Sequence, residues 1–436
     1  MLEIKRVKET VLLIGVMLPG VRNNDYQESM VELARLAETA GAEVADFIIQ
    51  RLQKPNAGTY IGKGKLEQLK ARIQSEKITS IIFNDNLSPS QARNIAEAVH
   101  CNVVDRTELI LDIFARHAKT KQAKLQVELA QLEYNYSRLR NLWQHLSRIE
   151  GGIGFRGPGE KQIELDRREI QKKIDILKSK ISNIEKTIRT QRKSRKDTLS
   201  IALVGYTNAG KSTLFNRLLK SQRYTADQLF ATLDAQTRSL RLDTGENVVF
   251  TDTIGFIRQL PHALITSFHS TLMEVMEADL LIHVVDASHP RLNDNIRSVE
   301  AVLTELGADN KNILTVFNKS DKLRGTKALF IRKNLLVDDP HALFISARCD
   351  ENLNPLFEKI KYFLSHKKTL ETFYIPAIMK NLVAYLFENT EVIEDNWDEK
   401  SEKHVLVVRV LKKMVPGIQR QISKQEYDDL KFDTNN

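Results

Sequence analysis

The apolar and polar positions divide the chain of 436 residues into four stretches with different periodicity. Short apolar runs alternate with amphipathic helical stretches over residues 1–115 and again over 197–366. Residues 116–196 carry a helical periodicity throughout, whereas apolar and polar residues alternate only weakly over residues 367–436. Strands that alternate with helices predict a parallel sheet. We therefore expect an α/β protein: an N-terminal parallel-sheet α/β domain, a long antiparallel helical hairpin, a second α/β domain and a small C-terminal α+β domain.

The first stretch, residues 1–115, predicts alternating strands and helices in detail. Gly41 is placed to end the first helix, and Ser88-Pro89 is a typical helix start, with an N-cap serine and a proline in the first turn. The predicted strands are residues 11–17, 44–49, 80–83 and 102–104, and the predicted helices are 26–40, 65–73 and 88–99.

The second stretch predicts two long helices, because apolar residues step by four and three alternately, as at the a and d positions of a coiled coil. Since the segment between the two helices is short, they should pair antiparallel. Arg167 interrupts the second seam once. The first seam is Leu125, Leu129, Leu132, Tyr136, Leu139, Trp143 and Leu146, and the second is Ile163, Ile170, Ile174, Leu177, Ile181, Ile184 and Ile188.

Positive charge is concentrated in this hairpin. Residues 116–196 contain 21 Lys and Arg against 9 Asp and Glu, whereas the remainder of the chain is close to neutral. A charge run is usually a solvated face, but a concentrated net excess favours a polyanionic partner such as nucleic acid.

The predicted turn of the hairpin contains five glycines in nine residues. A turn between helices needs one or two, so we interpret the loop as an RNA-contacting tip in which Phe155 stacks on a base and Arg156 pairs with phosphate. The alternative is a mobile loop that has no function of its own. The candidate RNA-binding residues are Gly151, Gly152, Ile153, Gly154, Phe155, Arg156, Gly157, Pro158 and Gly159.

A phosphate-binding P-loop follows the predicted strand 199–204 and precedes a predicted helix, which is the context that this motif requires. Backbone N–H groups would wrap the phosphates, Lys211 would reach the outer phosphates, and the Ser212 hydroxyl would ligate Mg²⁺. The candidate residues are Gly205, Tyr206, Thr207, Asn208, Ala209, Gly210, Lys211, Ser212 and Thr213.

A second motif, Asn318-Lys319-Ser320-Asp321, follows the predicted strand 313–317 and indicates guanine. The Asp321 carboxylate can accept both the ring N–H and the amino group of guanine, a donor pair that adenine lacks. A backbone N–H near Ser346 and Ala347, with Arg348 beside them, would face the guanine carbonyl oxygen.

Two further segments are candidate switches. Asp252, Thr253, Ile254 and Gly255 follow the predicted strand 248–251, and Asp252 would hold Mg²⁺ through water while the Gly255 N–H contacts the γ-phosphate. Thr232, preceded by Phe230 and Ala231, is the candidate second protein ligand of Mg²⁺; a plain loop threonine is the alternative. The predicted metal ligands are thus Ser212, Thr232 and Asp252.

Phe256 stands where many small GTPases carry the glutamine that orients the attacking water, so intrinsic hydrolysis should be slow. Asn208 is either a support for a K⁺ ion that acts as a positive charge near the phosphates, or a residue that stabilises the loop. The candidate catalytic residues are Lys211, Thr232, Gly255 and Asn208.

The composition indicates a cytoplasmic protein. Mean hydropathy is −0.33, and the apolar run at residues 11–18 is too short to span a membrane. Cys101 and Cys349 are far apart, so neither a disulfide framework nor a zinc site is expected. We expect a monomer.

These motifs together resemble the HflX family of translation-associated GTPases, over roughly residues 10 to 365. The resemblance rests on the segments Tyr60–Lys65, Asp105–Thr107, Gln126–Leu132, Gly151–Gly154, Arg156–Glu160, Asp166–Arg168, Gly205–Ser212, Leu229–Asp234 and Asp252–Ile257.

The resemblance implies a GTPase that is stimulated by the ribosome, binds the large ribosomal subunit and its rRNA, and separates stalled or idle ribosomes into subunits. It also implies that the hairpin tip projects toward the peptidyl-transferase centre. A GTPase for ribosome assembly or RNA maturation, and a regulator that binds a protein or membrane surface, are the alternatives. ATP binding by the N-terminal domain, reported for some members, stays open.

The sequence departs from the family pattern in three places. Phe155 and Lys161 replace common threonines near the hairpin tip, and Ala235-Gln236 replaces the usual Pro-Thr after the first switch. None of these changes removes a group that we assign to nucleotide chemistry.

Overall fold

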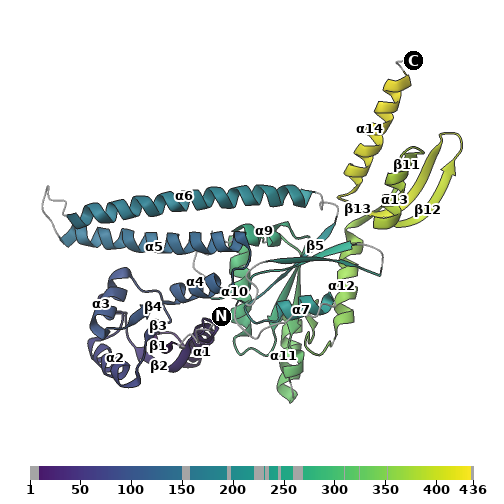
Figure 1. The fold of residues 1–436 in the computed structure, drawn as a ribbon. Helices are drawn as coiled ribbons and strands as arrows, with labels where there is room; N and C mark the ends of the chain where they lie inside the picture. Colours follow the sequence, from purple (N-terminus) through teal and green to yellow (C-terminus); the bar gives the residue numbers. More distant parts are fainter. Residues whose placement is uncertain are drawn as a thin grey trace, which may run out of the picture. The chain divides into compact units, whose positions relative to one another are not determined.

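The computed structural model describes residues 9–149, 158–193, 198–219, 230, 235–243, 247–258, 269–308, 310–323, 325–350 and 352–433 (Figure 1). The chain forms two compact units, and each is described by itself. The first unit comprises Met1–Glu185, Thr225–Asp234 and Ile254–Leu272, and the second comprises Lys186–Tyr224, Ala235–Thr253 and Met273–Asn436.

The first unit contains a fully parallel sheet in the order β2-β1-β3-β4. Its strands are β1 (Thr10–Met17), β2 (Glu43–Arg51), β3 (Ser80–Phe83) and β4 (Asn102–Val104), and its helices are α1 (Asn23–Thr39), α2 (Lys63–Glu76), α3 (Pro89–Val99) and α4 (Arg106–His117). Apolar side chains of β1 and β3 form the core with α2 and α3. The predicted strands and helices of this domain are confirmed, whereas α4 was not anticipated.

Local sequence explains two of these boundaries. The Ser88 side chain accepts from the Gln91 backbone N–H at 3.2 Å, and the Gln91 side chain accepts from the Ser88 N–H at 2.9 Å, which completes a capping box at the start of α3. Gly41 has φ +85°, the left-handed conformation that glycine adopts without strain just after a helix.

The helical hairpin consists of α5 (Lys121–Ile149) and α6 (Pro158–Lys193), which run antiparallel (Figure 1). The predicted seam is confirmed over the part whose side chains the structure describes, where Leu129 of α5 packs with Ile174, Leu177 and Ile181 of α6. Arg167, the interruption in the seam, places its guanidinium over the ring of Tyr136, 5.8 Å from the ring centre. The charged side chain of Arg167 is therefore accommodated in the seam by a cation–π contact. Pro158 and Gly159 begin α6, and residues 151–157 lie outside the described part.

The second unit is built on a six-stranded sheet in the order β10-β9-β8-β5-β7-β6. β6 runs antiparallel to β7, so the sheet is mixed rather than purely parallel. The strands are β5 (Leu199–Val204), β6 (Gln236–Arg241), β7 (Asn247–Asp252), β8 (Leu280–Asp286), β9 (Ile313–Asn318) and β10 (Leu343–Phe344). The helices are α7 (Lys211–Leu218), α9 (His269–Glu277), α10 (Leu292–Glu305), α11 (Gly325–Asp338) and α12 (Leu353–His366), with a short 3-10 turn η1 (Ser320–Lys322).

The C-terminal part of the second unit is an antiparallel three-stranded sheet in the order β11-β13-β12. The small α+β domain that the sequence predicts for residues 367–436 is therefore present, with two helices beside the sheet. The elements are β11 (Lys368–Pro376), α13 (Lys380–Asn389), β12 (Glu391–Asp398), β13 (Lys403–Leu411) and α14 (Val415–Asp433). No helix within the described residues is long and apolar enough to cross a membrane.

Candidate nucleotide-binding site

The P-loop connects β5 to α7, and two of its glycines are required by geometry. Gly205 has φ +153°, and a Cβ there would lie 2.2 Å from the Val284 carbonyl oxygen of β8. Gly210 has φ +95°, and its Cβ would lie 2.2 Å from Asn318 Nδ2. The loop therefore runs against β8 and β9 so closely that only glycine fits. It delivers Lys211 and Ser212 to the first turn of α7, and the N-terminus of a helix favours an anion.

Lys211 is buried at the centre of this loop, with 6% of its surface exposed. Its Nζ donates to the carbonyl oxygens of Gly205 and Tyr206 at 3.0 and 2.9 Å. Burial lowers the pKa of Lys211 to about 8, and the nearby Asp252 carboxylate opposes this effect. A buried ammonium in this position is ready to attract phosphate, because an anion would replace the missing solvation.

Asn318 and Lys319 fasten the P-loop to the end of β9. The Asn318 Nδ2 donates to the Ala209 carbonyl at 2.9 Å, and its Oδ1 accepts from the Ala347 N–H at 3.0 Å. The Lys319 Nζ donates to the Asn208 carbonyl at 2.7 Å. Asn318 thus joins the P-loop to the segment that is predicted to bind the base, and Asn208 contributes its backbone, at φ +58°, to the same link.

The residues that the sequence predicts to recognise the base meet at the ends of β9 and β10. The Ser346 hydroxyl donates to Asp321 Oδ1 at 2.7 Å and accepts from the Cys349 N–H at 3.3 Å. Ser346 is fully buried, so its hydroxyl fixes the orientation of the carboxylate. The Arg348 carbonyl accepts from the Arg217 guanidinium at 3.1 Å, which holds this loop against α7.

The carboxyl end of β7 supplies the candidate metal ligand. Asp252 is 1% exposed, and the neighbouring Thr253 hydroxyl donates to the Leu203 carbonyl at 2.6 Å, which ties this end of β7 to β5. A carboxylate and the Ser212 hydroxyl are hard oxygen donors of the kind that Mg²⁺ prefers. The Thr207 hydroxyl is buried and has no hydrogen-bond partner among the described residues, so the P-loop also holds a donor for a ligand oxygen.

The remaining predicted residues are distributed differently. Thr213 lies in the first turn of α7. Ile254 and Gly255 belong to the first unit, as does Phe256, whose side chain is 1% exposed. Ala231 and Thr232 lie outside the described residues, and so do residues 151–157 of the predicted RNA-binding tip.

Sequence reasoning missed two groups beside the site. Asp286, at the end of β8, forms a 2.8 Å ion pair with Lys319; burial alone would raise its pKa, but Lys319 and hydrogen bonds from Ser288 lower it. His283 lies inside the same strand, 4% exposed, and burial together with the charge of Lys211 lowers its pKa to about 4. The signal for both was present: a polar residue within, or directly after, a short apolar strand.

Comparison with family models assigns all three N-terminal parts of the chain. Residues 27–115 match a model described as GTP-binding GTPase N-terminal, and residues 117–195 match the GTP-binding GTPase middle region. Residues 200–319 match a model described as 50S ribosome-binding GTPase.

Similar proteins agree with this assignment over nearly the whole chain. GTPase HflX of Caldanaerobacter subterraneus subsp. tengcongensis is 42% identical over 91% of this chain and 90% of its own length. GTPase HflX of Magnetococcus marinus is 39% identical over 98% of both chains. GTPase HflX of Escherichia coli is 39% identical over 88% of this chain and 90% of its own length.

One similar solved structure is that of a GTP-binding protein from the archaeon Sulfolobus solfataricus in complex with GDP. It is 28% identical and has a TM-score of 0.44, covering 81% of this chain and 98% of its own.

Proposed function

Because this chain belongs to the HflX family of GTPases, we propose that it binds the large ribosomal subunit and separates stalled or idle ribosomes into subunits. The observation that carries this proposal is the match of residues 200–319 to a family model described as a 50S ribosome-binding GTPase. The description of that model covers ribosome binding, and our proposal adds the separation of the subunits.

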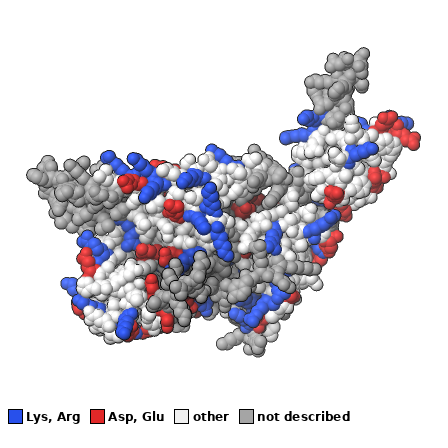
Figure 2. All heavy atoms as spheres, viewed as in Figure 1, with Lys and Arg blue, Asp and Glu red and all other residues white. Residues whose placement is uncertain are grey.

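The charge of the hairpin supports an RNA partner. Lys and Arg side chains are spaced along the outer surface of α5 and α6, with fewer acidic side chains between them (Figure 2). Lys172, Lys173 and Lys180 on α6 are exposed, and Lys178 forms a 2.8 Å ion pair with Glu133 on α5. Lysines that are free to meet phosphates contribute affinity that depends on salt, as expected for rRNA contacts. We assign direct RNA contact to the tip, Gly151–Gly159.

The nucleotide cycle supplies the switch. Lys211 and the P-loop N–H groups would hold the phosphates, while Ser212, Thr232 and Asp252 would hold Mg²⁺, which neutralises charge on the transferred phosphoryl group. The Gly255 N–H would contact the γ-phosphate. GTP would order both switch segments, and hydrolysis would release them, so the two nucleotide states differ in affinity for the ribosome.

Hydrolysis by the isolated protein should be slow, because the buried Phe256 side chain cannot orient water. The ribosome would then supply the missing stimulation. Asn208 would support a K⁺ ion near the phosphates, in place of a fixed positive charge. The protein would act as a monomer in the cytoplasm.

Sedimentation of purified 70S ribosomes through a sucrose gradient tests this proposal. With a non-hydrolysable GTP analogue, the protein should convert 70S particles into subunits and travel with the large one, whereas with GDP it should not. If it binds neither 70S particles nor the mature large subunit, the splitting function is wrong. Binding to precursor subunits alone would instead establish a role in ribosome assembly.

Matched charge-reversal variants test which surface of the protein contacts the large ribosomal subunit. Lys172→Glu combined with Lys173→Glu on α6 should weaken binding to the large subunit and reduce its dependence on salt. Lys54→Glu combined with Lys63→Glu makes the same charge change at exposed positions of the N-terminal domain. If both pairs weaken binding equally, the effect is one of net charge rather than of the hairpin.

A further inference from the structure

The carboxyl ends of β8 and β9 are joined by an ion pair whose acidic member, Asp286, belongs to none of the predicted motifs. Asp286 is the last residue of β8 and lies beside Asn318, the last residue of β9, because the two strands pair in parallel. The Nζ of the next residue, Lys319, lies 2.8 Å from Asp286 Oδ2. The side chains of Asp286 and Lys319 are only 14% and 19% exposed, so salt and water screen this pair little.

The Asp286 carboxylate is oriented by bonds that do not involve Lys319. Its Oδ1 accepts from the Ser288 N–H at 3.0 Å and from the Ser288 hydroxyl at 2.6 Å. An aspartate that binds the backbone two residues later forms a local turn by itself. The Ala287 N–H donates to the Asn318 carbonyl at 2.9 Å, which ties this turn to the end of β9. The second oxygen, Oδ2, is thereby held toward Lys319.

Lys319 extends this arrangement to the P-loop. Its Nζ donates to the Asn208 carbonyl at 2.7 Å as well as to Asp286. An ammonium group has three donors, so it binds both oxygens at once. The Lys319 backbone has φ +62°, a left-handed conformation that is uncommon for a long side chain and persists only where its surroundings enforce it. The bond to the Asp286 carboxylate, which is a strong charge-assisted one, contributes to that enforcement.

The bond from Lys319 orients one peptide group of the P-loop, and Asn318 orients the next. The Asn208 carbonyl accepts from Lys319, and the Ala209 carbonyl accepts from Asn318 at 2.9 Å. Because a trans peptide directs its C=O and the following N–H to opposite sides, the Gly210 N–H points away from Asn318. The backbone N–H groups of this loop are the groups that would bind phosphate. Their directions are therefore fixed from the end of β9.

We infer that Asp286 is a positioning residue for guanine-nucleotide binding, because it holds Lys319 against the Asn208 carbonyl and so fixes the backbone of the P-loop. The inference rests on the proposed role of the P-loop as the nucleotide site. Without the Asp286 charge, a neutral carbonyl alone would hold the ammonium group. The loop would then occupy further conformations, and each one that cannot bind phosphate lowers the apparent affinity in proportion to its population.

The test measures the affinity of Asp286→Asn, Lys319→Met and the double variant for a fluorescent GDP analogue. Asp286→Asn should weaken binding roughly 10-fold, the effect expected for the loss of one hydrogen bond to a charged group, and Lys319→Met at least as much. Because Asp286 acts through Lys319, the double variant should bind no more weakly than Lys319→Met alone. Unchanged affinity in Asp286→Asn, or effects that multiply in the double variant, would overturn the inference.

Asp279→Asn is the matched control at the opposite end of β8. Asp279 pairs with Lys413 at 2.9 Å and accepts from the Ser200 N–H and hydroxyl at 3.0 and 3.2 Å. The variant therefore loses the same kinds of bonds as Asp286→Asn, but at the amino ends of the strands, whereas the P-loop follows the carboxyl end of β5. Its thermal midpoint should fall by a similar amount while GDP affinity stays within about twofold. An equal loss of affinity would reduce the role of Asp286 to general stability.

Two further variants complete the test. Ser288→Ala removes one bond to Asp286 Oδ1 but keeps the carboxylate charge, so it is decisive even if Asp286→Asn does not fold. It should weaken GDP binding roughly two- to threefold, and unchanged affinity would also overturn the inference. Lys211→Ala tests the premise: if it leaves GDP affinity unchanged, the P-loop is not the nucleotide site, and the proposed function fails independently of Asp286.

Discussion

Ser346 holds Asp321 in place: the buried hydroxyl donates a 2.7 Å hydrogen bond to one carboxylate oxygen. Ser346 follows β10 and Asp321 follows β9, so two adjacent parallel strands bring the pair together. A carboxylate has about four lone-pair directions, and the Ser346 bond uses one of them. The remaining directions can accept the two N–H donors of guanine from a side chain that is already oriented.

Replacing Asp321 by Asn should therefore change base selectivity. The amide keeps one acceptor oxygen but presents an NH₂ group toward the guanine donors, so two favourable contacts become one favourable and one repulsive. We expect GTP affinity to fall on the order of 100-fold, with a relative gain for xanthosine triphosphate, which carries a carbonyl in place of the amino group. Competition against a fluorescent guanine nucleotide measures both.

The control for this variant is Asp339→Asn, a change of the same kind in the second unit away from the predicted motif. Its selectivity should be that of the unmodified protein. Equal GTP affinity and selectivity in Asp321→Asn would show that the base is recognised elsewhere.

The arrangement of the candidate nucleotide site was predictable because each of its parts is local in sequence. The P-loop, Asp252 and the segment 318–321 each follow a short apolar run, and parallel strands carry the ends of such runs to one edge of a sheet. What the sequence did not reveal is the connection between these parts. Asn318 bridges Ala209 and Ala347 through contacts between residues far apart in the chain, and no periodicity encodes such a contact.

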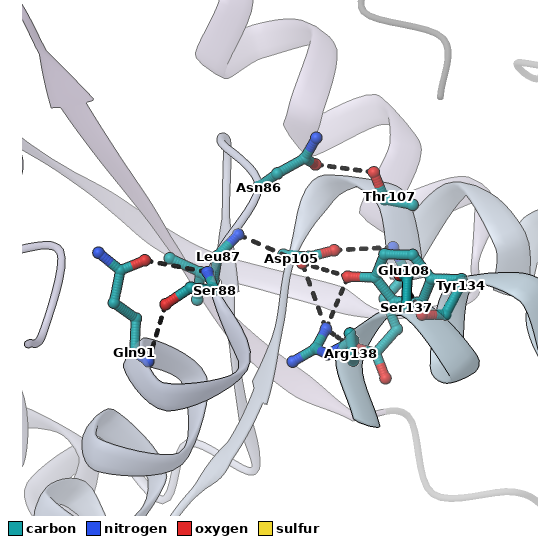
Figure 3. A network of polar contacts seen from close by, with 10 residues as sticks. All are labelled: Asn86, Leu87, Ser88, Gln91, Asp105, Thr107, Glu108, Tyr134, Ser137 and Arg138. Carbon is teal, nitrogen blue, oxygen red and sulfur yellow. Dashed lines mark hydrogen bonds and ion pairs between the residues drawn. The ribbon is translucent and has the colours of Figure 1, made fainter. Parts of the chain in front are cut away.

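The contacts of Asp105 in the N-terminal domain could not be predicted from the sequence, for a different reason. The buried Asp105 carboxylate caps α4 by accepting from the Glu108 N–H at 2.9 Å (Figure 3). It also accepts from the Leu87 N–H at 3.3 Å and from the Tyr134 hydroxyl, and it pairs with Arg138 at 3.3 Å. Asp105 was recognisable only as part of a motif, because a lone acidic residue before a helix is normally an exposed cap. Its burial follows from the packing of α4 against α5, and the seam pattern marks the face between α5 and α6 but not the face that meets α4.

Asp105→Asn should destabilise the first unit. Asparagine still caps α4, but the ion pair with the half-buried Arg138 is lost, and this guanidinium keeps only its 3.6 Å pairing with Glu108. We expect the free energy of unfolding to fall by about 1–3 kcal/mol. Asp112→Asn is the matched control, since Asp112 is an exposed residue of the same helix, 3.9 Å from Arg116, and should change stability by less than about 0.5 kcal/mol. Urea denaturation of both variants measures this difference, and equal midpoints would contradict a structural role for Asp105.

Nucleotide binding should take up a proton at alkaline pH. The pKa of Lys211 is lowered to about 8 by burial, and a bound phosphate would raise it again by supplying negative charge. Below pH 8 the lysine is protonated before and after binding, so affinity is insensitive to this group. Above pH 8 the free protein has lost the proton and must regain it, so affinity should fall as pH rises, by up to about tenfold per pH unit.

Calorimetric titration with GDP in two buffers of different ionisation enthalpy counts these protons. At pH 7.0 the observed binding heats in the two buffers should agree. At about pH 8.5 they should differ by an amount that corresponds to the uptake of most of one proton. Lys211→Arg keeps a permanent positive charge and should abolish the difference, although it weakens binding, as Lys211→Ala should do more strongly. Identical heats at pH 8.5 for the unmodified protein would place the lysine pKa well above 8.

His283 should make the second unit sensitive to acid. Burial and the charge of Lys211 lower its pKa to about 4, below the usual value of 6.5. The unfolded chain therefore gains a proton at higher pH than the folded one, so the stability contribution of neutral His283 is complete above pH 6.5 and is lost as pH falls toward 4. The free energy of unfolding should change by up to about 3 kcal/mol through this group.

In His283→Gln the free energy of unfolding should fall less steeply between pH 6.5 and 4 than in the unmodified protein. His341→Gln, at an exposed position of the same unit, should leave the slope unchanged. Parallel slopes for all three proteins would mean that His283 titrates alike in the folded and unfolded states.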